Sequence, residues 1–339
     1  MKAWRLTPSK SLTLCEEQSE ATPEGNVKIK INKSLVSRPD ICIYDDSISK
    51  PENLVPICSC CGMVVEVGEG VTSLSRGDRV FVKTQRFCEA CLACRKGKYS
   101  DCQNVEYYGI TRDGFARDFA VVQETDCAKL PDRISDDSAV FLDYIAVATQ
   151  TIISTGVKKG EHLVISGMSA LGLVLGQVAL YHQIVPIIID VEEKYLEKAK
   201  ELGMYYTVNA KAQDPKDKIF HITGGKMAEC VAHISSGEVP LSVSMDCVGK
   251  SGTLAVVGRH GGKYNLDCSL RPVIENAVTV IGIDSSGSNM QIAINMIANK
   301  AINVESLIIG TVGFMDIPTL LEETANSPDH LKKIIDFKQ

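Results

Sequence analysis

Four cysteines lie close together in the segment CEACLACRKGKYSDC, with two, two and seven residues between them: Cys88, Cys91, Cys94 and Cys102. Thiolates at this spacing can converge tetrahedrally on Zn²⁺ within one short lobe, residues 84–103. An iron–sulfur cluster is disfavoured, because the last cysteine is too distant for the bacterial ferredoxin spacing and no proline follows it. Zinc held by four cysteines has no open coordination position. The cluster therefore predicts a structural zinc ion.

A second motif, GMSALG, follows the apolar run HLVISG and precedes a helical pattern. Its spacing is that of G-x-G-x-x-G, the turn that binds a dinucleotide pyrophosphate at a helix N-terminus, although Ser169 stands at the middle glycine. Gly167 allows the tight turn, and Gly172 allows close packing of the helix. Gly167, Ser169, Leu171 and Gly172 are therefore candidate cofactor-binding residues.

Asp190 ends the next apolar run, 18 positions after Gly172. A carboxylate at this place can accept hydrogen bonds from the ribose hydroxyls of an adenosine and repels a 2′-phosphate. The sequence therefore predicts NAD as the cofactor in preference to NADP. The alternative is an ordinary βαβ turn in which Asp190 caps the helix EEKYLEKAKELG.

The elements that must position these motifs change in kind along the chain. Roughly the first 145 residues contain short β-type runs, for example at 26–31, 62–71 and 78–82. From about residue 160, apolar runs alternate with helical stretches, which predicts a parallel sheet of about six strands with crossover helices. Amphipathic helices are predicted at 288–302 and 318–336. The fold class is therefore α/β, a β-rich part followed by a doubly wound parallel sheet.

Composition limits the class of function. The net charge is −6 without a block of like charges, which argues against a nucleic-acid surface or a basic membrane patch. The N-terminus lacks the apolar core of a signal peptide, and no run reaches the ~18 apolar residues of a membrane span. Thirteen cysteines, many of them alone in apolar stretches, do not suggest a disulfide framework. We expect a cytoplasmic protein that acts on small molecules.

The order of several segments resembles that in the zinc-containing medium-chain alcohol and polyol dehydrogenases. These segments are GNVKIKI, VVEVGEGVTSLSRGDRV, the four-cysteine lobe, YYGITRDGFARDFAVV and HLVISGMSALGL with Asp190. The resemblance implies a GroES-like catalytic domain, residues 1–146 and 284–339, interrupted by a Rossmann domain, residues 147–283. It also implies an active site in the cleft between them and a homodimer or homotetramer.

Members of this family carry a second, catalytic zinc ion, which acts as a Lewis acid on the substrate oxygen. The resemblance places Ser37 at the first ligand of that ion and Pro39 at the hydroxyl residue that relays the alcohol proton. Only Asp40 matches the family in this segment. Ser37 is a poor ligand, and Pro39 cannot pass on a proton.

The remaining ligand positions also differ from the family pattern. Cys58 and Ser59 stand where a His-Glu pair is usual, and Asp143 stands at the third ligand. Cys60 or Cys61 would add another thiolate, whereas a buried strand is an equally good interpretation of PICSCCG. The sequence therefore predicts that the ordinary catalytic zinc site is not retained.

Three functions remain open. The first is an NAD(H)-dependent oxidoreductase that transfers a hydride to or from a small alcohol, carbonyl or activated alkene without a zinc alkoxide, with Tyr44, Cys42 or Cys58 as proton donor. The second is a zinc-dependent polyol or secondary-alcohol dehydrogenase with a metal shell of Cys58, Asp143 and water. The third is a non-catalytic NAD-binding member of the family.

Overall fold

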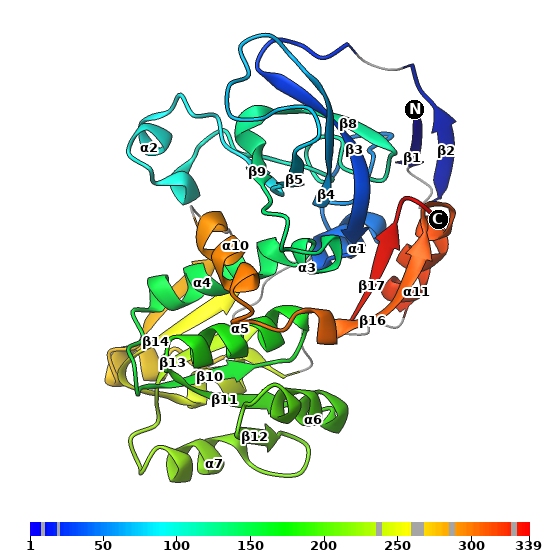
Figure 1. Ribbon diagram of the computed structural model, residues 1–339. Coiled ribbons are helices and arrows are strands. Elements are labelled where there is room, and N and C mark those ends of the chain that lie inside the picture. The colour runs from blue at the N-terminus through cyan, green and yellow to red at the C-terminus, as the bar shows by residue number, and fades with distance from the viewer. Residues whose placement is uncertain (8–10, 19–20, 235–238, 259–267, 285–288, 327–330) are drawn as a thin grey trace.

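The computed structural model describes residues 1–339 except 8–10, 19–20, 235–238, 259–267, 285–288 and 327–330. Figure 1 shows a β-rich domain in the upper half and a domain of helices around a sheet in the lower half. Among the described residues, no helix combines the length and the apolar character that crossing a membrane requires.

The lower domain is built on a parallel sheet of six described strands, in the order β12-β11-β10-β13-β14-β15. These strands are β10 (His162–Ser166), β11 (Val185–Asp190), β12 (Tyr206–Asn209), β13 (Ala228–Ile234), β14 (Val248–Val257) and β15 (Thr279–Ile283). Strands β10 and β11 are almost continuously buried, as expected where helices cover both faces of a sheet. Side chains alternate between two apolar clusters, so that Ile165 and Val164 of β10 face opposite layers.

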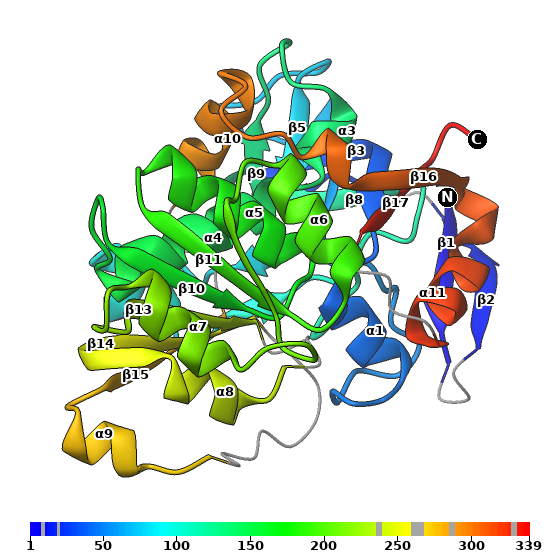
Figure 2. The same ribbon diagram turned by 90° about the horizontal axis from the view of Figure 1, so that it is seen from below.

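Helices cover both faces of this sheet (Figure 2). They are α4 (Leu142–Thr155), α5 (Ala170–Tyr181), α6 (Glu193–Glu201), α7 (Pro215–Ile222), α8 (Leu241–Asp246) and α10 (Met290–Ala298). The short helix α9 (Arg271–Glu275) lies beyond the edge strand β15 and buries none of its residues. Helix α10 packs on α4, and its Ile294 belongs to the same apolar cluster as Ile165 of the sheet. The limits of the two domains, 147–283 for the inserted one, stay a prediction. The fold class itself is confirmed.

The first strand of the domain, β10, lies between β11 and β13, so the order of the strands reverses there. Ligands of doubly wound sheets bind at this switch point, outside the carboxyl ends of the strands. Gly167 and Ser169 follow β10, and Asp190 is the last residue of β11. The topology therefore places the predicted cofactor residues at one edge of the sheet.

The upper domain contains a sheet of seven described strands in the order β16-β17-β3-β4-β5-β9, with β8 paired to β3. They are β3 (Asn26–Leu35), β4 (Cys60–Val67), β5 (Arg79–Val82), β8 (Phe119–Gln123), β9 (Cys127–Lys129), β16 (Ile308–Gly313) and β17 (Lys332–Asp336). Since β17 pairs with β3, the C-terminal part of the chain returns to the domain that the N-terminal part began.

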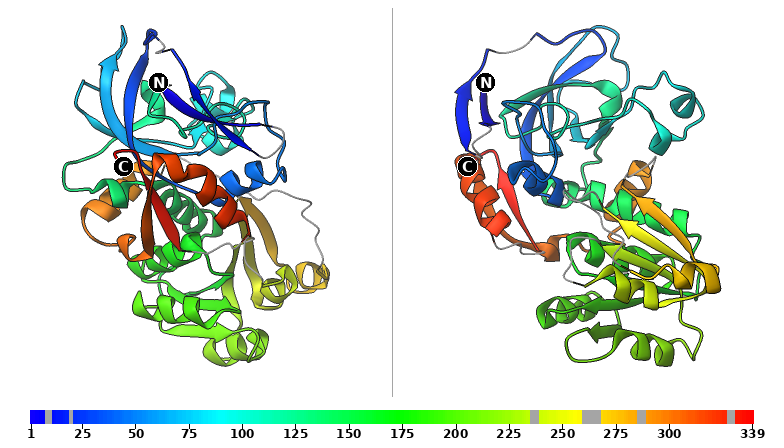
Figure 3. Two further views of the ribbon diagram at one scale, coloured as in Figure 1. Left: turned by 90° about the vertical axis from the view of Figure 1, so that its right-hand side faces the viewer. Right: turned by 180° about the vertical axis from the view of Figure 1, so that it is seen from behind.

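Short elements complete this domain. The strands β1 (Lys2–Leu6) and β2 (Leu12–Glu16) form one ribbon, and β6 (Gln85–Arg86) pairs with β7 (Glu106–Tyr107). The α-helices are α1 (Arg38–Tyr44), α2 (Leu92–Arg95), α3 (Asp136–Ala139) and α11 (Ile317–Asn326). The 3₁₀ turns are η1 (Tyr99–Asp101), η2 (Glu124–Asp126), η3 (Glu305–Leu307) and η4 (Phe314–Asp316). Figure 3 shows α2 in a lobe that projects from the rest of the domain.

The predicted helix over 318–336 is wrong in its second half. Helix α11 ends at Asn326, and Lys332–Asp336 form strand β17. The spacing of Leu320, Leu321, Ile334 and Ile335 suits a helix, but β17 gains ladder hydrogen bonds from β16 on one side and β3 on the other. Ile334 and Ile335 pack into different apolar clusters on the two faces of the sheet. Tertiary pairing therefore overrides the local pattern.

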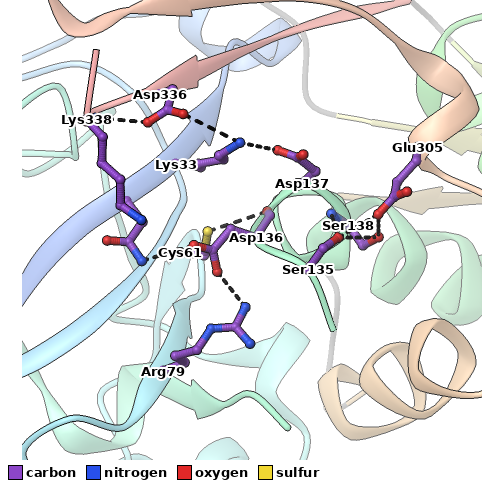
Figure 4. A network of polar contacts seen from close by, with 11 residues as sticks. Lys33, Cys61, Arg79, Ser135, Asp136, Asp137, Ser138, Glu305, Asp336 and Lys338 are labelled. Atoms are coloured by element: carbon purple, nitrogen blue, oxygen red, sulfur yellow. Dashed lines mark hydrogen bonds and ion pairs between the residues drawn. The ribbon is translucent and has the colours of Figure 1, made fainter. Parts of the chain in front are cut away.

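Polar contacts tie the returning segment to the start of the chain (Figure 4). The ammonium of Lys33 on β3 contacts Asp137 at 2.5 Å and Asp336 of β17 at 3.6 Å. The hydroxyl of Ser135, the residue before α3, donates to the carboxylate of Glu305 at 2.6 Å. These contacts hold residues 135–137, which precede α4, against Lys33 near the start of the chain and Glu305 near its end.

Candidate active site

The four predicted zinc ligands converge. Their sulfur atoms all lie within 4.8 Å of one another, in a lobe formed by α2 and the 3₁₀ turn after it. The sulfur of Cys88 lies 3.9 Å from that of Cys94 and 3.6 Å from that of Cys102. Four Zn–S bonds of about 2.3 Å in a tetrahedron require sulfur separations of about 3.8 Å. Cys88, Cys91, Cys94 and Cys102 therefore fit a zinc ion with a closed shell.

The electrostatics of the lobe also suit a cation. The backbone N–H of Cys94 donates to the sulfur of Cys91 and lowers the pKa of that thiol to about 6. Backbone N–H groups likewise lower the pKa of Cys88. Burial, followed by the neighbouring thiols, raises the pKa of Cys94 to about 12, a cost that a divalent ion offsets by its charge. In the part of the chain that the structure describes, no other group of three or more His, Cys, Asp or Glu has metal-binding geometry.

The turn before α5 explains why serine replaces the middle glycine. Ser169 is the N-cap of α5, and its hydroxyl accepts from the backbone N–H of Gly172 at 3.4 Å. Gly167 has φ +87°, a conformation that favours glycine. A Cβ on Gly172 would lie 2.9 Å from the Met168 side chain and 3.1 Å from the Gly167 carbonyl oxygen. The turn thus presents the N-terminus of a twelve-residue helix, which attracts anions.

Asp190 supports this turn. Its carboxylate accepts from the backbone N–H of Met168 at 2.5 Å and from that of Glu192, just before α6, at 2.9 Å. Burial raises the pKa of Asp190, and these backbone N–H groups act in the opposite direction. The side chain is only 2% exposed. A carboxylate has about four lone-pair sites, so two backbone bonds leave capacity for ribose hydroxyls.

A cleft opens beside the turn and brings most of the predicted catalytic residues together. Six predicted residues line it: Ser37, Cys58, Ser59, Asp143, Ser169 and Leu171. Asp40 lies behind the wall of the cleft and is fully buried. Gly167, Gly172 and Asp190 lie outside the lining and shape the turn from behind. The predicted catalytic side chains therefore face the predicted cofactor turn.

Ser37 is engaged by the protein itself. Its backbone N–H and its hydroxyl both donate to one carboxylate oxygen of Asp40, at 2.7 Å and 2.5 Å. Ser37 is the N-cap of α1, and Asp40 stands in the first turn of that helix. Asp40 therefore closes the helix N-terminus and holds Ser37 through these hydrogen bonds, although burial raises the pKa of its carboxyl group.

Cys58 stays a thiol in this setting. Burial raises the pKa of Cys58 well above its usual value, and the charges of Asp40 and Asp143 add to the effect. A protonated thiol is a poor metal ligand and a poor nucleophile. Cys60 and Cys61 are fully buried in β4, and burial raises the pKa of both, so they pack as small hydrophobic residues.

Asp143 also has protein partners. The backbone N–H of Thr84 donates to its carboxylate at 3.2 Å, and the Thr84 hydroxyl donates to the same oxygen. Burial raises the pKa of Asp143 to about 6. Its carboxyl group can therefore hold or release a proton near neutral pH.

Sequence reasoning missed several residues of the cleft. Arg38 lines the cleft, and its buried Nε has no hydrogen-bond partner among the described residues. Lys332 lines the same cleft, although it is distant in sequence and was placed in a helix.

Two of the predicted proton donors do not line the cleft. Cys42 is fully buried within the upper domain, and Tyr44 lies at the end of α1, where the charge of Glu322 acts on it. Tyr107 and Tyr144 line the cleft instead. Tertiary packing decides this, because α1 turns its Ser37 end toward the cofactor turn and its Tyr44 end away from it.

Two family models match the chain. The alcohol dehydrogenase GroES-like domain matches residues 23–132, and the zinc-binding dehydrogenase domain matches residues 170–324. Together they cover more than half of the chain. The protein belongs to the zinc-containing medium-chain alcohol dehydrogenase family and is an oxidoreductase of that type.

Individual relatives agree with this assignment. Sorbitol dehydrogenase of Halalkalibacterium halodurans is 28% identical over 86% of this chain and 87% of its own. L-threonine 3-dehydrogenase of Pyrococcus abyssi is 29% identical over 82% of this chain and 81% of its own. In fold alone, the chain is similar to a structure described as a short chain alcohol dehydrogenase of Escherichia coli CFT073 in complex with NADH, with a TM-score of 0.89 at 22% identity and 99% of each chain covered.

Proposed function

We propose that this protein is an NAD(H)-dependent oxidoreductase that transfers a hydride to or from a small alcohol or carbonyl compound without a catalytic zinc ion. One observation carries the proposal. The cleft keeps the cofactor turn on one wall, whereas the side chains at the former ligand positions on the other wall are held by Asp40 and Thr84. Ser37 and Asp143 are thus engaged within the protein, and Cys58 is kept protonated.

The residues that would hold the cofactor converge from distant segments. Arg38 and Lys332 bring two cations to the cleft. Ser169 and Leu171, at the N-terminus of α5, line the same cleft. Guanidinium and ammonium groups beside a helix N-terminus suit a pyrophosphate. A bound nicotinamide supplies or accepts the hydride. The protein orients it against the substrate and excludes water.

Protons in the cleft are held by Cys58 and Asp143. The high pKa of Cys58 keeps its thiol protonated, so it can donate a hydrogen bond to a substrate oxygen. Asp143, with a pKa of about 6, can exchange a proton near neutral pH. Cys58 and Asp143 are therefore available for the proton transfer that a metal-bound oxygen and a hydroxyl residue carry out in other members of the family.

Turnover without added metal tests the proposal. Polyols, secondary alcohols, aldehydes and activated alkenes would be assayed with NAD(H), with and without zinc and with a chelator that leaves the four-cysteine cluster loaded. We expect turnover of at least one class that neither zinc nor the chelator changes. Zinc-dependent alcohol oxidation that disappears in Cys58→Ala or Asp143→Ala would contradict it and restore the family mechanism.

One observation favours the zinc-dependent alternative. Cys58 and Asp143 line the same cleft, and the charge of Asp143 acts on the Cys58 thiol. A metal ion that released the Cys58 proton would recruit both residues with water as further ligands. Elemental analysis separates the alternatives, because this shell requires two zinc ions per chain and our proposal requires one.

NAD is the preferred cofactor in this proposal. Asp190 and Glu192 place negative charge beyond the turn, where a 2′-phosphate would meet repulsion. We expect NADH to bind more tightly than NADPH in a fluorescence titration. Asp190→Ala should weaken NADH binding by about 1.5–3 kcal/mol, the range for a hydrogen bond to a charged group. Equal affinity of the unmodified protein for both cofactors would overturn the preference.

We also propose a cytoplasmic enzyme that assembles as a homodimer or homotetramer. Strand β15 is the outer described strand of the parallel sheet, and its Val280 is 41% exposed. Ile274 on the neighbouring α9 is 81% exposed. An edge strand flanked by exposed apolar side chains suits pairing with a second copy. Light scattering would detect an assembly, and a monomer at micromolar concentration would contradict it.

A further inference from the structure

The described chain passes between the two domains twice, and polar contacts join the two passages. The first runs from α3 into α4, and the second from α10 through η3 into β16. Oε1 of Glu305, in η3, accepts from the hydroxyl of Ser135 at 2.6 Å and from that of Ser138 at 2.7 Å (Figure 4). These hydrogen bonds lower the pKa of Glu305, so its carboxylate stays charged at neutral pH. The second passage is therefore bound to the upper domain at α3.

The same passage is also bound to the lower domain. Gln177 on α5 is 7% exposed, and its carboxamide makes two hydrogen bonds with the backbone of Asn303. Nε2 donates to the Asn303 carbonyl oxygen at 3.3 Å, and Oε1 accepts from the Asn303 N–H at 2.7 Å. The Asn303 side chain accepts from the backbone N–H of Ser306 at 3.2 Å and so holds the turn into η3. We name Ser135, Ser138, Gln177, Asn303 and Glu305 the polar joint.

Apolar side chains next to the polar joint in sequence belong to a cluster that both domains share. Ile302, Val304 and Leu307 are buried in this cluster. It also contains Phe81 of β5 in the upper domain and Ile165 of β10 in the lower domain. Protein interiors are close-packed, so a displacement of one domain against the other would open voids in the cluster. The packing around the polar joint therefore opposes a change in the relative position of the domains.

The polar joint connects the two walls of the cleft, although none of its residues belongs to the described lining. Gln177 lies on α5, and Ser169, the N-cap of that helix, lines the cleft at the cofactor turn. On the other side, Asp137 of α3 contacts Lys33 of β3 at 2.5 Å. Strand β3 ends at Leu35, which lines the cleft from the upper domain. Hydrogen bonds and regular elements thus link the cofactor turn to the facing wall.

We propose that Glu305 and Gln177 are positioning residues, which fix the distance between the cofactor turn and the upper wall of the cleft through the polar joint. The inference goes beyond the proposed function and rests on its NAD(H) binding. In that function the lower domain binds the adenosine half of the cofactor at Asp190, and the nicotinamide half lies between the two walls. A fixed separation of the walls therefore stabilises binding of the whole cofactor and not of its adenosine half.

NADH and AMP, which lacks the nicotinamide half, test the polar joint. Each would be titrated by calorimetry into the zinc-loaded protein. Glu305→Ala should weaken NADH binding by at least about 5-fold, the lower end for coupling between separate sites, and should change AMP binding by less than about 2-fold. Glu305→Gln should keep the NADH affinity, because its amide oxygen can still accept from both serines. Glu197→Ala, at an exposed position of α6, is the matched control and should change neither affinity.

A second substitution separates one joint from two independent contacts. Gln177→Met keeps the side-chain length but loses both hydrogen bonds to Asn303, and it should weaken NADH binding as much as Glu305→Ala does. Either change already breaks the joint, so the double variant should bind NADH no more weakly than each single variant, whereas independent contacts would give additive losses. Thermal unfolding shows that each variant is folded. The comparison of Glu305→Ala with Glu305→Gln remains decisive if Gln177→Met does not fold.

Three results would overturn the proposal: a smaller loss of NADH affinity in Glu305→Ala, equal losses for NADH and AMP, or additive losses in the double variant. Failure of the proposed function looks different. If the unmodified protein does not bind NADH, the NAD(H) function fails and the positioning role fails with it. If it binds NADH and the Glu305 variants behave like Glu197→Ala, only the positioning role fails. If turnover depends on a second zinc ion, the metal-free mechanism fails, and the titrations still decide the role of the polar joint.

Discussion

The four-cysteine cluster draws its ligands from residues 88–102, whereas the cleft draws its side chains from segments between Ser37 and Lys332. In the cluster, sulfur atoms face one another, and the Cys88 sulfur contacts those of Cys94 and Cys102. In the cleft, Ser37 and Asp143 are held by protein partners, Asp40 and Thr84.

This difference shows what a metal site requires beyond suitable residue types. Thiols that repel one another when ionised gain most from a cation, as in the lobe. The Asp143 carboxylate and the Cys58 thiol gain less from a metal ion. A metal ion would have to displace the hydrogen-bond partner of Asp143 and the proton of Cys58, whose pKa is raised. We therefore expect zinc to matter for the stability of one region and not for the chemistry of the other.

The largest effect is expected in the lobe. Cys94→Ser should remove the zinc ion, because three thiolates with one hydroxyl no longer form the closed shell, and should lower the free energy of unfolding by several kcal/mol. Elemental analysis and thermal unfolding measure both effects. Cys15→Ser, outside the lobe, is the control. A Cys94→Ser protein that kept its zinc and its thermal stability would refute the ligand assignment.

A smaller effect concerns pH and the cleft. The pKa of Asp143 is about 6 in the folded state, above its value of 3.8 when exposed, so the folded state binds more protons between these values. The free energy of unfolding should therefore decrease as the pH rises from about 4 to 6, by about 2 kcal/mol from this group. Denaturant titrations of the unmodified protein and Asp143→Asn would be compared. A slope with pH that is the same in both would contradict the expectation.

The smallest effect distinguishes a helix cap from a metal ligand at Ser37. Ser37→Ala removes one hydrogen bond to Asp40 but leaves the backbone N–H bond, so we expect a loss of about 1 kcal/mol in the free energy of unfolding. The zinc content should not change, and urea titration with elemental analysis measures both quantities. Loss of a zinc ion in this variant would show that Ser37 belongs to a metal shell.

The sequence predicted the overall fold well, because its strongest signals are local. Buried strands β10 and β11, the turn between Gly167 and Gly172, and the return of the chain to the first domain follow from apolar runs and from the family resemblance. The exception is Lys332–Asp336, where pairing with β3 and β16 outweighs a helical pattern. Sequence periodicity does not contain that information, since both partner strands are distant.

For the cleft, the sequence predicted which residues stand at the family's metal-ligand positions and which turn would bind the cofactor. The spacing of Cys88 to Cys102 also determined a site by itself, because a short segment limits how far its thiols can separate. The tertiary structure decided which side chains have partners and which face the cleft. Arg38, Gln85, Tyr144 and Lys332 were found only there, because the packing of α1, β6, α4 and β17 against one another sets which side chains meet.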